Sequence, residues 1–375
     1  MINNQLQDIL AKFKFSRNSG DRAVGVDIGS SSIKVVEVKK KNGRAVLGTY
    51  GMISLGPYDN LEIGRVTNLP AEKIVEALKE TLKQSRVSTT SSALAIPAQS
   101  SLIFVIELPG QIKKSEISSV VPTEARKYIP VPIDEVSLDW FVLPKKEISF
   151  EEANNPELAS SPPEKIEVLA IAIQNDTILK YRSIVKESKL TAGFFEVEIF
   201  SSIRSNLEHE LSPVLLMDFG ASLTKLSILE FGTVKRFHLI DRGGADISDA
   251  ISKSLGISFS AAEEMKKEYG LFGNPKEKNL AEVIKTHLDY IFSETNNVLL
   301  GYEKKYSRVI DKVILTGGGS SLKGLKEVAL NNFKGEVVLS RPFSKIGTPA
   351  FLEKVLETIG PEFGVAVGLA LRKLK

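Results

Sequence analysis

The feature that most constrains the fold is a strand–turn–strand pattern that occurs twice, half a chain apart. Residues 24–38 read VGVDIGSSSIKVVEV, and residues 214–229 read VLLMDFGASLTKLSIL. Each has an apolar strand, an aspartate, a glycine two residues later, small or hydroxyl residues, and a lysine that opens a second strand. Asp27 and Asp218 are 191 residues apart, about half of the 375-residue chain. The repeat predicts an internally duplicated α/β unit.

The segments around the two turns alternate between strand and helix patterns. The turn-rich stretch at residues 145–165 is polar and carries prolines, which predicts a long exposed loop inside a domain. A helix within residues 115–129 should end before Pro130, because a residue that precedes proline disfavours helical geometry. Apolar residues at helical spacing predict further helices at 71–85, 175–190, 241–256, 281–306 and 364–374. Strand patterns occur at 92–97, 100–108, 137–143 and 166–173.

The composition excludes several classes of protein. The chain has 49 basic and 46 acidic residues, so its balance gives no reason to expect nucleic-acid binding. The absence of cysteine excludes disulfides and thiolate metal sites and fits a reducing compartment. Only three histidines occur and no HExxH spacing exists, so a zinc centre is not expected. No apolar run approaches the roughly 20 residues that span a bilayer, and no secretory signal pattern is present, so we expect a cytoplasmic protein.

The N-terminal segment has the pattern of an amphipathic helix. Its apolar residues fall on one helical face, with basic residues following on the polar side. One interpretation is a short helix docked on its own or a neighbouring molecule, and the other is a membrane-surface anchor. The apolar residues are Ile2, Leu6, Ile9, Leu10 and Phe13, and the basic ones are Lys12, Lys14 and Arg17.

The familiar nucleotide-binding loops are absent. Gly319 and Gly324 have the glycine spacing of a P-loop, but Leu325 stands where the lysine is required. The dinucleotide fingerprint also fails, because Gly317 and Gly319 are followed by Leu322 in place of the third glycine. No GxSxG nucleophile elbow occurs either. Phosphate binding by the paired hairpin turns is the remaining interpretation.

The paired turns have the chemistry for a magnesium-bound polyphosphate. Glycine and small residues let backbone N–H groups approach phosphate oxygens, and the hydroxyls add donors. An aspartate and a phosphate are both anions, so the aspartates make sense only with Mg²⁺ between them, usually through metal-bound water. The candidate magnesium-side carboxylates are Asp27 and Asp218. The candidate phosphate ligands are Gly29, Ser30, Ser31, Ser32 and Lys34 at the first turn, and Gly220, Ser222 and Thr224 at the second.

Three further elements could complete a nucleotide site. Three glycines after the strand at 312–316 would let a base or ribose lie on bare backbone, although a tightly packed turn is the alternative. A Glu–Lys pair at i and i+3 on a helix could reach sugar hydroxyls, or be a solvated charge pair. A glycine pair before a helix could approach phosphate at the positive helix end. The residues are Gly317, Gly318, Gly319 and Ser320, then Glu263 and Lys266, then Gly243 and Gly244.

Taken in this order, the elements resemble the actin-like ATPase superfamily of actin, heat-shock-type chaperones, sugar kinases and the division protein FtsA. The phosphate-one, connect-one, phosphate-two and adenosine motifs of that superfamily match VDIGSSSIK, FEVEIFSSIR, MDFGASLTK and LTGGGSSLKGL. The resemblance implies ATP and Mg²⁺ as cofactors and Asp27 and Asp218 as catalytic residues. It also places Glu198 near the attacking water or metal, with Glu196 as a nearby competitor.

Within the superfamily the chain resembles the PilM family of type IV pilus assembly proteins. The resemblance covers about Arg22 to Arg372 and rests on GVDIGSSSIK, EARKYIPVPIDEV, AEEMK, LTGGGSSLKGL and VAVGLALR. Two departures are the long stretch at 145–165 and an N-terminal helix longer than the family pattern. A third is Ala221, which stands where chaperones and kinases carry a further glycine. This last difference fits a slow ATPase better than a fast one.

The resemblance implies a ribonuclease-H-type duplicated α/β core of the actin kind with an inserted FtsA-style small domain. It also implies a groove between the inserted domain and the first core domain. This groove would bind the N-terminal peptide of a PilN-like inner-membrane protein, with Tyr128 and Ile129 as candidate contacts or simply as packing residues. The expected boundaries are 1–20 for an N-terminal helix and joint, 21–95 for the first core half (IA), 96–174 for the inserted domain, 175–212 for the remainder of IA, and 213–375 for the second half, with its IIB part at about 255–310.

The predicted function is a cytoplasmic ATP-binding scaffold, at most a slow ATPase, recruited peripherally to the inner membrane by a PilN-like partner. It would link nucleotide state to the PilN–PilO alignment complex. An FtsA-like filament former with self-association and membrane contact is the alternative. A small-molecule kinase is a third hypothesis, which needs a carboxylate base such as Asp134 or Asp139. The related secretion protein GspL is not favoured, because no transmembrane segment is seen.

Overall fold

A computed structural model describes residues 20–144, 165–208, 210, 212–274, 276–277 and 279–374. The expected N-terminal helix and, apart from Lys165, the loop at 145–165 lie outside the described residues. The elements of the first half are β1 (Arg22–Ile28), β2 (Ser32–Lys41), β3 (Arg44–Ser54), α2 (Ala71–Gln84), β4 (Ser91–Ile96), β5 (Ser101–Leu108), α3 (Ile117–Ala125), β6 (Val136–Val142), β7 (Ile166–Gln174), α6 (Asn175–Glu187), β8 (Thr191–Val197) and α7 (Glu198–Asn206).

The second half continues the same alternation of strands and helices. Its elements are β9 (Val214–Phe219), β10 (Thr224–Glu230), β11 (Thr233–Ile240), α8 (Gly244–Leu255), α9 (Phe259–Tyr269), α10 (Leu280–Tyr306), β12 (Lys312–Thr316), α11 (Leu325–Asn332), β13 (Glu336–Leu339), α12 (Glu353–Ile359) and α13 (Gly364–Leu374). The helices that the sequence pattern predicts within the described residues are therefore present. In the part of the chain that the structure describes, no helix is both long and apolar enough to cross a membrane.

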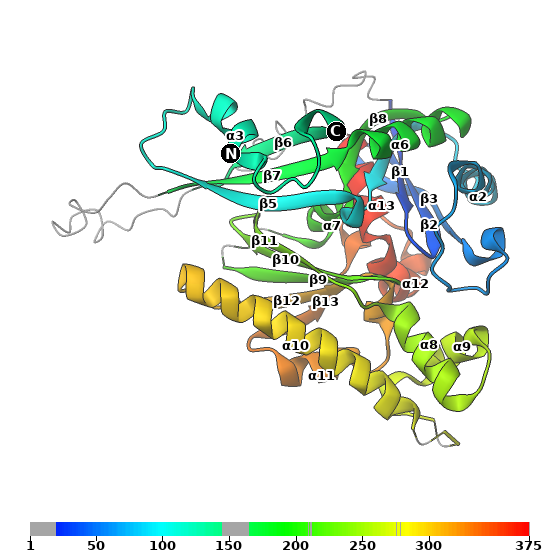
Figure 1. The fold of residues 1–375 in the computed structure, drawn as a ribbon. Coiled ribbons are helices and arrows are strands. Elements are labelled where there is room, and N and C mark those ends of the chain that lie inside the picture. Colours follow the sequence, from blue (N-terminus) through cyan, green and yellow to red (C-terminus); the bar gives the residue numbers. More distant parts are fainter. Residues whose placement is uncertain are drawn as a thin grey trace.

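The predicted duplication is confirmed by two five-stranded sheets with the same topology (Figure 1). Their strand orders are β3-β2-β1-β4-β8 and β11-β10-β9-β12-β13. In each sheet the first three strands form antiparallel hairpins, and the last two join in parallel beside the central strand. The central strands β1 and β9 each end in an Asp-x-Gly turn. The duplication therefore places the two turns at the same end of the central strand in each sheet.

Strand β1 is buried on both faces because helices cover both sides of its sheet. Val24 and Val26 pack in a cluster with side chains of α2 and α6. Ala23, on the opposite face, packs with α13. A Cβ on Gly25 would overlap the carbonyl of Ala366, so the glycine lets α13 lie directly on the strand. The C-terminal helix therefore packs on the first half of the molecule, although it follows the second half in sequence (Figure 1).

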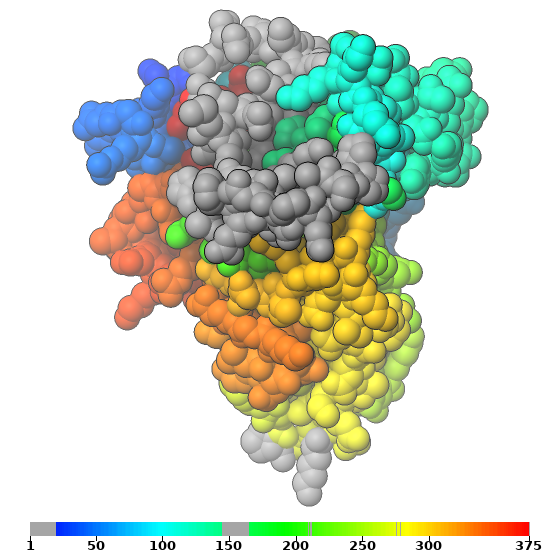
Figure 2. All heavy atoms as spheres, turned by 90° about the vertical axis from the view of Figure 1, so that its left-hand side faces the viewer, coloured from blue at the N-terminus to red at the C-terminus, as the bar shows by residue number. Residues whose placement is uncertain are grey.

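A separate antiparallel sheet of three strands, in the order β5-β7-β6, lies within the range expected for the inserted domain. Helix α3 covers one face of this sheet through Ile117 and Val121. The helix contains Pro122 and ends at Ala125, five residues before Pro130. Figure 2 shows this unit in cyan above the surface of α10 and α11, in yellow and orange. The domain boundaries given above remain predictions.

Candidate functional site

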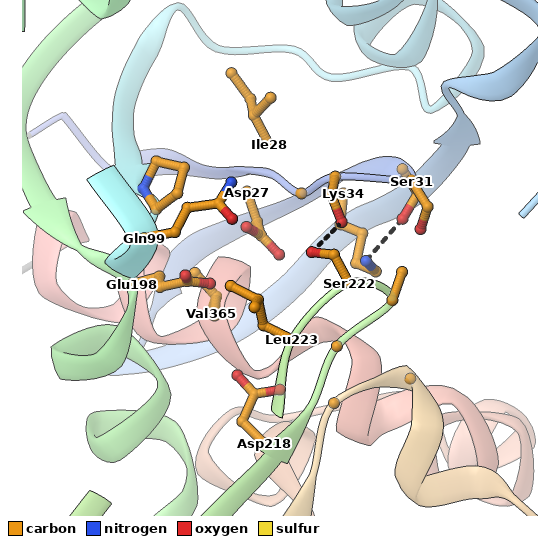
Figure 3. Close-up of a pocket in the computed structure, with 18 of the residues that line it drawn as sticks. Asp27, Ile28, Ser31, Lys34, Gln99, Glu198, Asp218, Ser222, Leu223 and Val365 are labelled. Atoms are coloured by element: carbon orange, nitrogen blue, oxygen red, sulfur yellow. Dashed lines mark hydrogen bonds between the residues drawn. The ribbon is translucent and has the colours of Figure 1, made fainter. Parts of the chain in front are cut away.

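The two hairpin turns face one cavity of about 280 Å³ between the halves of the molecule (Figure 3). Its walls come from the β1–β2 and β9–β10 turns, from α6 and α7, and from the residues before α13. Asp27 and Asp218 both line it, and in Figure 3 their carboxylates point into the same space. The predicted site residues in the lining are Asp27, Gly29, Ser30, Ser31, Ser32, Lys34, Glu198, Asp218, Gly220, Ser222, Gly317 and Gly318.

The first turn is closed by a backbone hydrogen bond and presents its hydroxyls to the cavity. The Gly29 N–H donates to the Ser32 carbonyl at 3.0 Å. The Lys34 ammonium donates to the Ser32 hydroxyl at 2.8 Å. The carbonyl of Ser30 accepts from the backbone N–H of Thr67, which ties the turn to the loop after β3. The turn is thus a preorganised group of hydroxyls and one ammonium at the cavity wall.

The second turn has the same closure and touches the first. The Gly220 N–H donates to the Leu223 carbonyl at 2.9 Å, and the Ser222 hydroxyl donates to the Ser30 hydroxyl at 3.1 Å. Gly243 does not line the cavity, and a Cβ there would overlap the carbonyl of Ala221. Gly243 therefore allows close packing behind the second turn, where the Gly244 N–H donates to the Gly220 carbonyl at 2.9 Å. The two turns meet through these serine hydroxyls, and both serines line the cavity.

Three carboxylates line the cavity in different electrostatic settings. Burial raises the pKa of Asp27 to about 6, while the positive charge of Lys34 opposes that rise. Glu198 accepts a hydrogen bond from the Ala98 N–H at 2.8 Å and another from the Lys225 ammonium at 2.7 Å. Asp218 lies 3.0 Å from the same ammonium. Within the described ranges, no group of three histidine, cysteine or acidic side chains is placed to hold a metal ion.

Lys225 is the site residue that sequence reasoning missed. Burial by itself lowers the pKa of Lys225, but the neighbouring Asp218 and Glu198 carboxylates outweigh burial and raise it. The ammonium therefore stays charged. A signal was present in the sequence, because Lys34 follows Asp27 and Lys225 follows Asp218 by the same seven residues.

Several candidate ligands lie outside the cavity lining. Thr224 is fully buried and donates its hydroxyl to the Arg242 carbonyl. Lys266 donates to the Gly244 carbonyl at 2.7 Å and pairs with Glu263 at 2.6 Å, so it ties α9 to the start of α8. The candidates that are absent from the lining are Thr224, Gly243, Gly244, Glu263, Lys266, Gly319 and Ser320.

The glycine loop after β12 reaches the cavity with its first two glycines, Gly317 and Gly318. Gly317 has φ of +80°, and a Cβ there would overlap the Asp218 carboxylate, so only glycine fits beside it. A short 3-10 turn over Gly318–Ser321 follows, and α11 begins only at Leu325. The loop therefore presents backbone at Gly317 and Gly318, and not a helix N-terminus.

The two glutamates of the connect-one segment are separated by the fold. Glu198 lines the cavity, whereas Glu196 is buried between Arg204 at 2.7 Å and Arg372 at 2.6 Å. β8 ends at Val197 and α7 begins at Glu198, so the rule that residues two apart on a strand share a face does not hold for this pair. The alternative between them is resolved in favour of Glu198 as the carboxylate that faces the cavity.

A second, smaller cavity of about 30 Å³ lies between the three-stranded sheet and the first core half. Its lining is mainly apolar and includes Ile171 and Phe200, together with Asp139 and Glu196. Tyr128 is not in the lining; it is 48% exposed and stacks on Phe104. Ile129 is buried in the core beneath α3. Neither Asp134 nor Asp139 lines the larger cavity, so neither is placed as the base of a kinase there.

Comparisons with known proteins agree with this architecture. Residues 25–374 match the model of the family described as type IV pilus assembly protein PilM. A chain of a solved PilM–PilN type IV pilus biogenesis complex is similar, with a TM-score of 0.76 and 26% identity over 95% of this chain and 99% of that one. The ethanolamine utilization protein EutJ from Carboxydothermus hydrogenoformans shares the fold, with a TM-score of 0.52 and 15% identity over 99% of this chain and 97% of EutJ.

The cell division protein FtsA from Staphylococcus epidermidis is also similar in sequence. It is 25% identical over 357 residues, which cover 85% of this chain and 74% of FtsA. FtsA from Enterococcus faecalis is 23% identical over 381 residues, covering 85% of this chain and 78% of that protein.

Proposed function

This chain belongs to the PilM family of type IV pilus assembly proteins, and we propose that it is an ATP-binding scaffold that holds the N-terminal cytoplasmic peptide of a PilN-like inner-membrane protein. The observation that carries the nucleotide part is the contact between the two turns. Ser222 of one half donates to Ser30 of the other, and both serines line a single cavity. A ligand that binds both turns would therefore join the two halves of the molecule.

The lining fits a triphosphate better than an uncharged ligand. The turns supply backbone N–H groups and the hydroxyls of Ser30, Ser31 and Ser222, and Lys34 adds a charged donor. The bare backbone at Gly317 and Gly318 leaves room for the nucleoside. A bound Mg²⁺ would neutralise phosphate charge. Because no group of three histidine, cysteine or acidic side chains among the described residues is placed to hold a metal ion, Mg²⁺ would reach Asp27 and Asp218 through water.

We expect at most slow hydrolysis. Both oxygens of Glu198 are engaged, one by the Ala98 N–H and the other by the Lys225 ammonium. A carboxylate whose two oxygens are both held in this way is less free to turn toward an attacking water and take its proton. The engagement of Glu198 therefore supports a binding role over a fast catalytic one.

The peptide part rests on the similarity to a chain of the PilM–PilN complex and on the second cavity. That cavity lies where the three-stranded sheet meets the first core half, so an occupant would touch both units. Its apolar wall suits an apolar side chain, and Ser137 and Asp139 add polar groups for a peptide backbone or amide. By this route the scaffold would be recruited to the inner membrane without a spanning helix of its own.

Calorimetry of the full chain with ATP–Mg²⁺ and a PilN-type N-terminal peptide tests both parts. We expect binding of each, and the Asp27→Ala and Asp218→Ala variants should weaken ATP–Mg²⁺ by more than about tenfold, or about 1.4 kcal/mol, while keeping native circular dichroism. Lys41→Ala, on the exposed end of β2, is the matched control and should bind like the wild type. Retention of neither ATP nor peptide at micromolar concentrations would contradict the proposal.

A further inference from the structure

The β2–β3 hairpin carries a concentration of positive charge at its tip. Residues 39–44 read KKKNGR, so four of the six are basic and none is acidic. We call the four basic residues the basic tip; they are Lys39, Lys40, Lys41 and Arg44. All of them except Lys39 are exposed, and Lys39 is partly buried. Because β2 begins at Ser32 on the cavity wall and ends at Lys41, the basic tip lies at the opposite end of the strand from the candidate nucleotide site.

The charges of the basic tip are not neutralised by the protein itself. Among the described residues, no carboxylate forms an ion pair with any of the four side chains. Glu37, two residues before Lys39, is buried and already accepts from Arg22 at 3.1 Å. Lys41 and Arg44 are direct partners in the strand register, and like charges that lie opposite each other destabilise a strand pair. An anion from outside the chain would remove this repulsion.

The N-terminal segment joins the fold beside the basic tip. The Asp21 carbonyl accepts a hydrogen bond from the Lys40 N–H at 2.8 Å, just before β1 begins. The sequence before that point combines apolar residues at helical spacing with further basic residues, which is typical of segments that lie in a membrane interface. Those basic residues are Lys12, Lys14 and Arg17. Two basic stretches of the sequence therefore meet at one end of the first sheet.

An anionic lipid layer fits this surface better than a nucleic acid does. The attraction of lysine and arginine side chains to acidic headgroups increases with their number, and it needs no shaped groove. A lipid layer can also bury the apolar residues of the neighbouring segment. Single-stranded nucleic acid is usually held by aromatic stacking as well as by charge, and residues 39–44 include no aromatic side chain.

We propose that the basic tip is a docking surface for the anionic headgroups of a lipid bilayer. The contact goes beyond the proposed function, because it needs neither a nucleotide nor a peptide partner. The ten residues of β2 separate the tip from the cavity wall by about 30 Å. A bilayer at the tip would therefore not touch the turns that are proposed to bind phosphate.

The test is co-sedimentation of the full chain with lipid vesicles. We expect binding to vesicles of phosphatidylcholine with about 30% phosphatidylglycerol and little binding to phosphatidylcholine alone. Binding should weaken as salt is raised, because salt screens exposed charges. The triple variant Lys39→Glu, Lys41→Glu, Arg44→Glu should lower the partition constant for the anionic vesicles by at least about tenfold. The same three positions changed to glutamine give a second variant, with a smaller change of charge, if the glutamate variant does not fold.

A matched control separates the basic tip from net charge. Lys304→Glu, Lys334→Glu and Lys354→Glu together change the charge by the same amount at exposed positions of the second half, and this variant should bind vesicles like the wild type. An equal loss in the control and the tip variant would overturn the proposal, and so would a tip variant that keeps full binding.

Two further measurements complete the test. A wild type that ignores anionic vesicles would overturn the proposal, and one that binds a short duplex RNA in their place would assign the basic tip to nucleic acid. The tip variant should bind ATP–Mg²⁺ like the wild type, because its substitutions lie at the far end of β2. Failure of the wild type to bind ATP would contradict the proposed function and leave the lipid contact standing.

Discussion

The β1–β2 and β9–β10 hairpins share spacing, register and turn closure, but they hold their charges differently. Lys225 is drawn to the carboxylates, whereas Lys34 turns to a hydroxyl. The reason lies in the residue two positions before each lysine. Ser32 stands five residues after Asp27, and the equivalent residue after Asp218 is the apolar Leu223. A single turn residue therefore decides whether the lysine is captured locally or reaches across the cavity.

Because of this difference, the aspartate of the second hairpin has a cationic partner within the protein, and the aspartate of the first hairpin does not. The second hairpin is satisfied internally, because its aspartate has an ammonium partner at 3.0 Å. In the first hairpin, among the described residues, Asp27 has no ion pair and is only 8% exposed. The first hairpin is thus the one whose charge is left for a ligand or its metal to compensate.

The largest expected effect comes from removing the second hairpin's carboxylate charge. Asp218→Asn should lower the free energy of unfolding by about 2–3 kcal/mol, because Lys225 then loses one of its two buried partners. Urea unfolding of the variant and the wild type measures the difference. Asp289→Asn is the control, since its exposed pair with Lys285 at 3.8 Å should contribute less than about 0.5 kcal/mol. If Asp218→Asn and Asp289→Asn lowered the free energy of unfolding equally, the buried pair of Asp218 would be no more stabilising than an exposed one.

The equivalent change in the first hairpin should have the opposite sign. Asp27→Asn should raise the free energy of unfolding by about 1 kcal/mol at pH 8, because a buried carboxylate without an ion pair is replaced by a neutral amide of the same shape. Thermal unfolding in nucleotide-free buffer measures the change. A lower melting temperature for this variant would mean that Asp27 is already compensated, as Asp218 is.

A smaller effect should follow from deleting the hydroxyl that captures Lys34. In Ser32→Ala the ammonium loses its partner in the turn and should move to Asp27, directly across the strands. The new pair would offset the lost hydrogen bond, so stability should change by less than about 1 kcal/mol. A crystal structure of the variant shows where the Lys34 ammonium lies. An ammonium that stays at the turn would show that backbone geometry, and not Ser32, directs it.

The smallest effect is expected at a charge cluster far from both hairpins, which provides a baseline. Hydrogen bonds from Lys165 and then Lys305 lower the pKa of Glu107 to about 2. The folded state therefore binds fewer protons than the unfolded state between about pH 4.5 and 2, so this contribution is present above pH 4.5 and is lost toward pH 2.

Glu107→Gln measures that baseline by difference from the wild type. At pH 6 the variant should be less stable by under about 1 kcal/mol, since Glu107 is a third exposed and its pairs are screened by solvent. The difference between the two proteins should vanish as the pH falls toward 2. A difference that persists at low pH would assign the effect to packing and not to charge.

Much of the fold was accessible from local pattern. The two Asp-x-Gly turns, the helices α2, α6, α8 and α10, and the duplicated α/β plan all follow from apolar periodicity and turn residues over short stretches. The aspartates and the turn serines were identified for the same reason. Each belongs to a strand end or a tight turn, whose backbone course depends mainly on a few neighbouring residues.

The candidates outside the cavity lining have the predicted residue types and spacing, but packing gives several of them other partners. Thr224 has the right residue type beside the turn, but its hydroxyl is consumed by the Arg242 carbonyl. Lys266 has the right helical spacing from Glu263, but both are consumed at the start of α8. A sequence pattern indicates the residue type and the face of the helix or strand on which a side chain lies. It does not show which other group already forms hydrogen bonds with that side chain's polar atoms.

Local order along the chain was thus enough to specify the two hairpins and their acidic turns, because neighbours in sequence govern backbone geometry there. The pairing of Lys225 with Glu198, the choice of Glu198 over Glu196, and the seat of Gly317 against Asp218 came from packing between distant segments. Such contacts depend on how the halves close on each other. Electrostatic energy depends on distance in space, and separation along the chain does not give that distance.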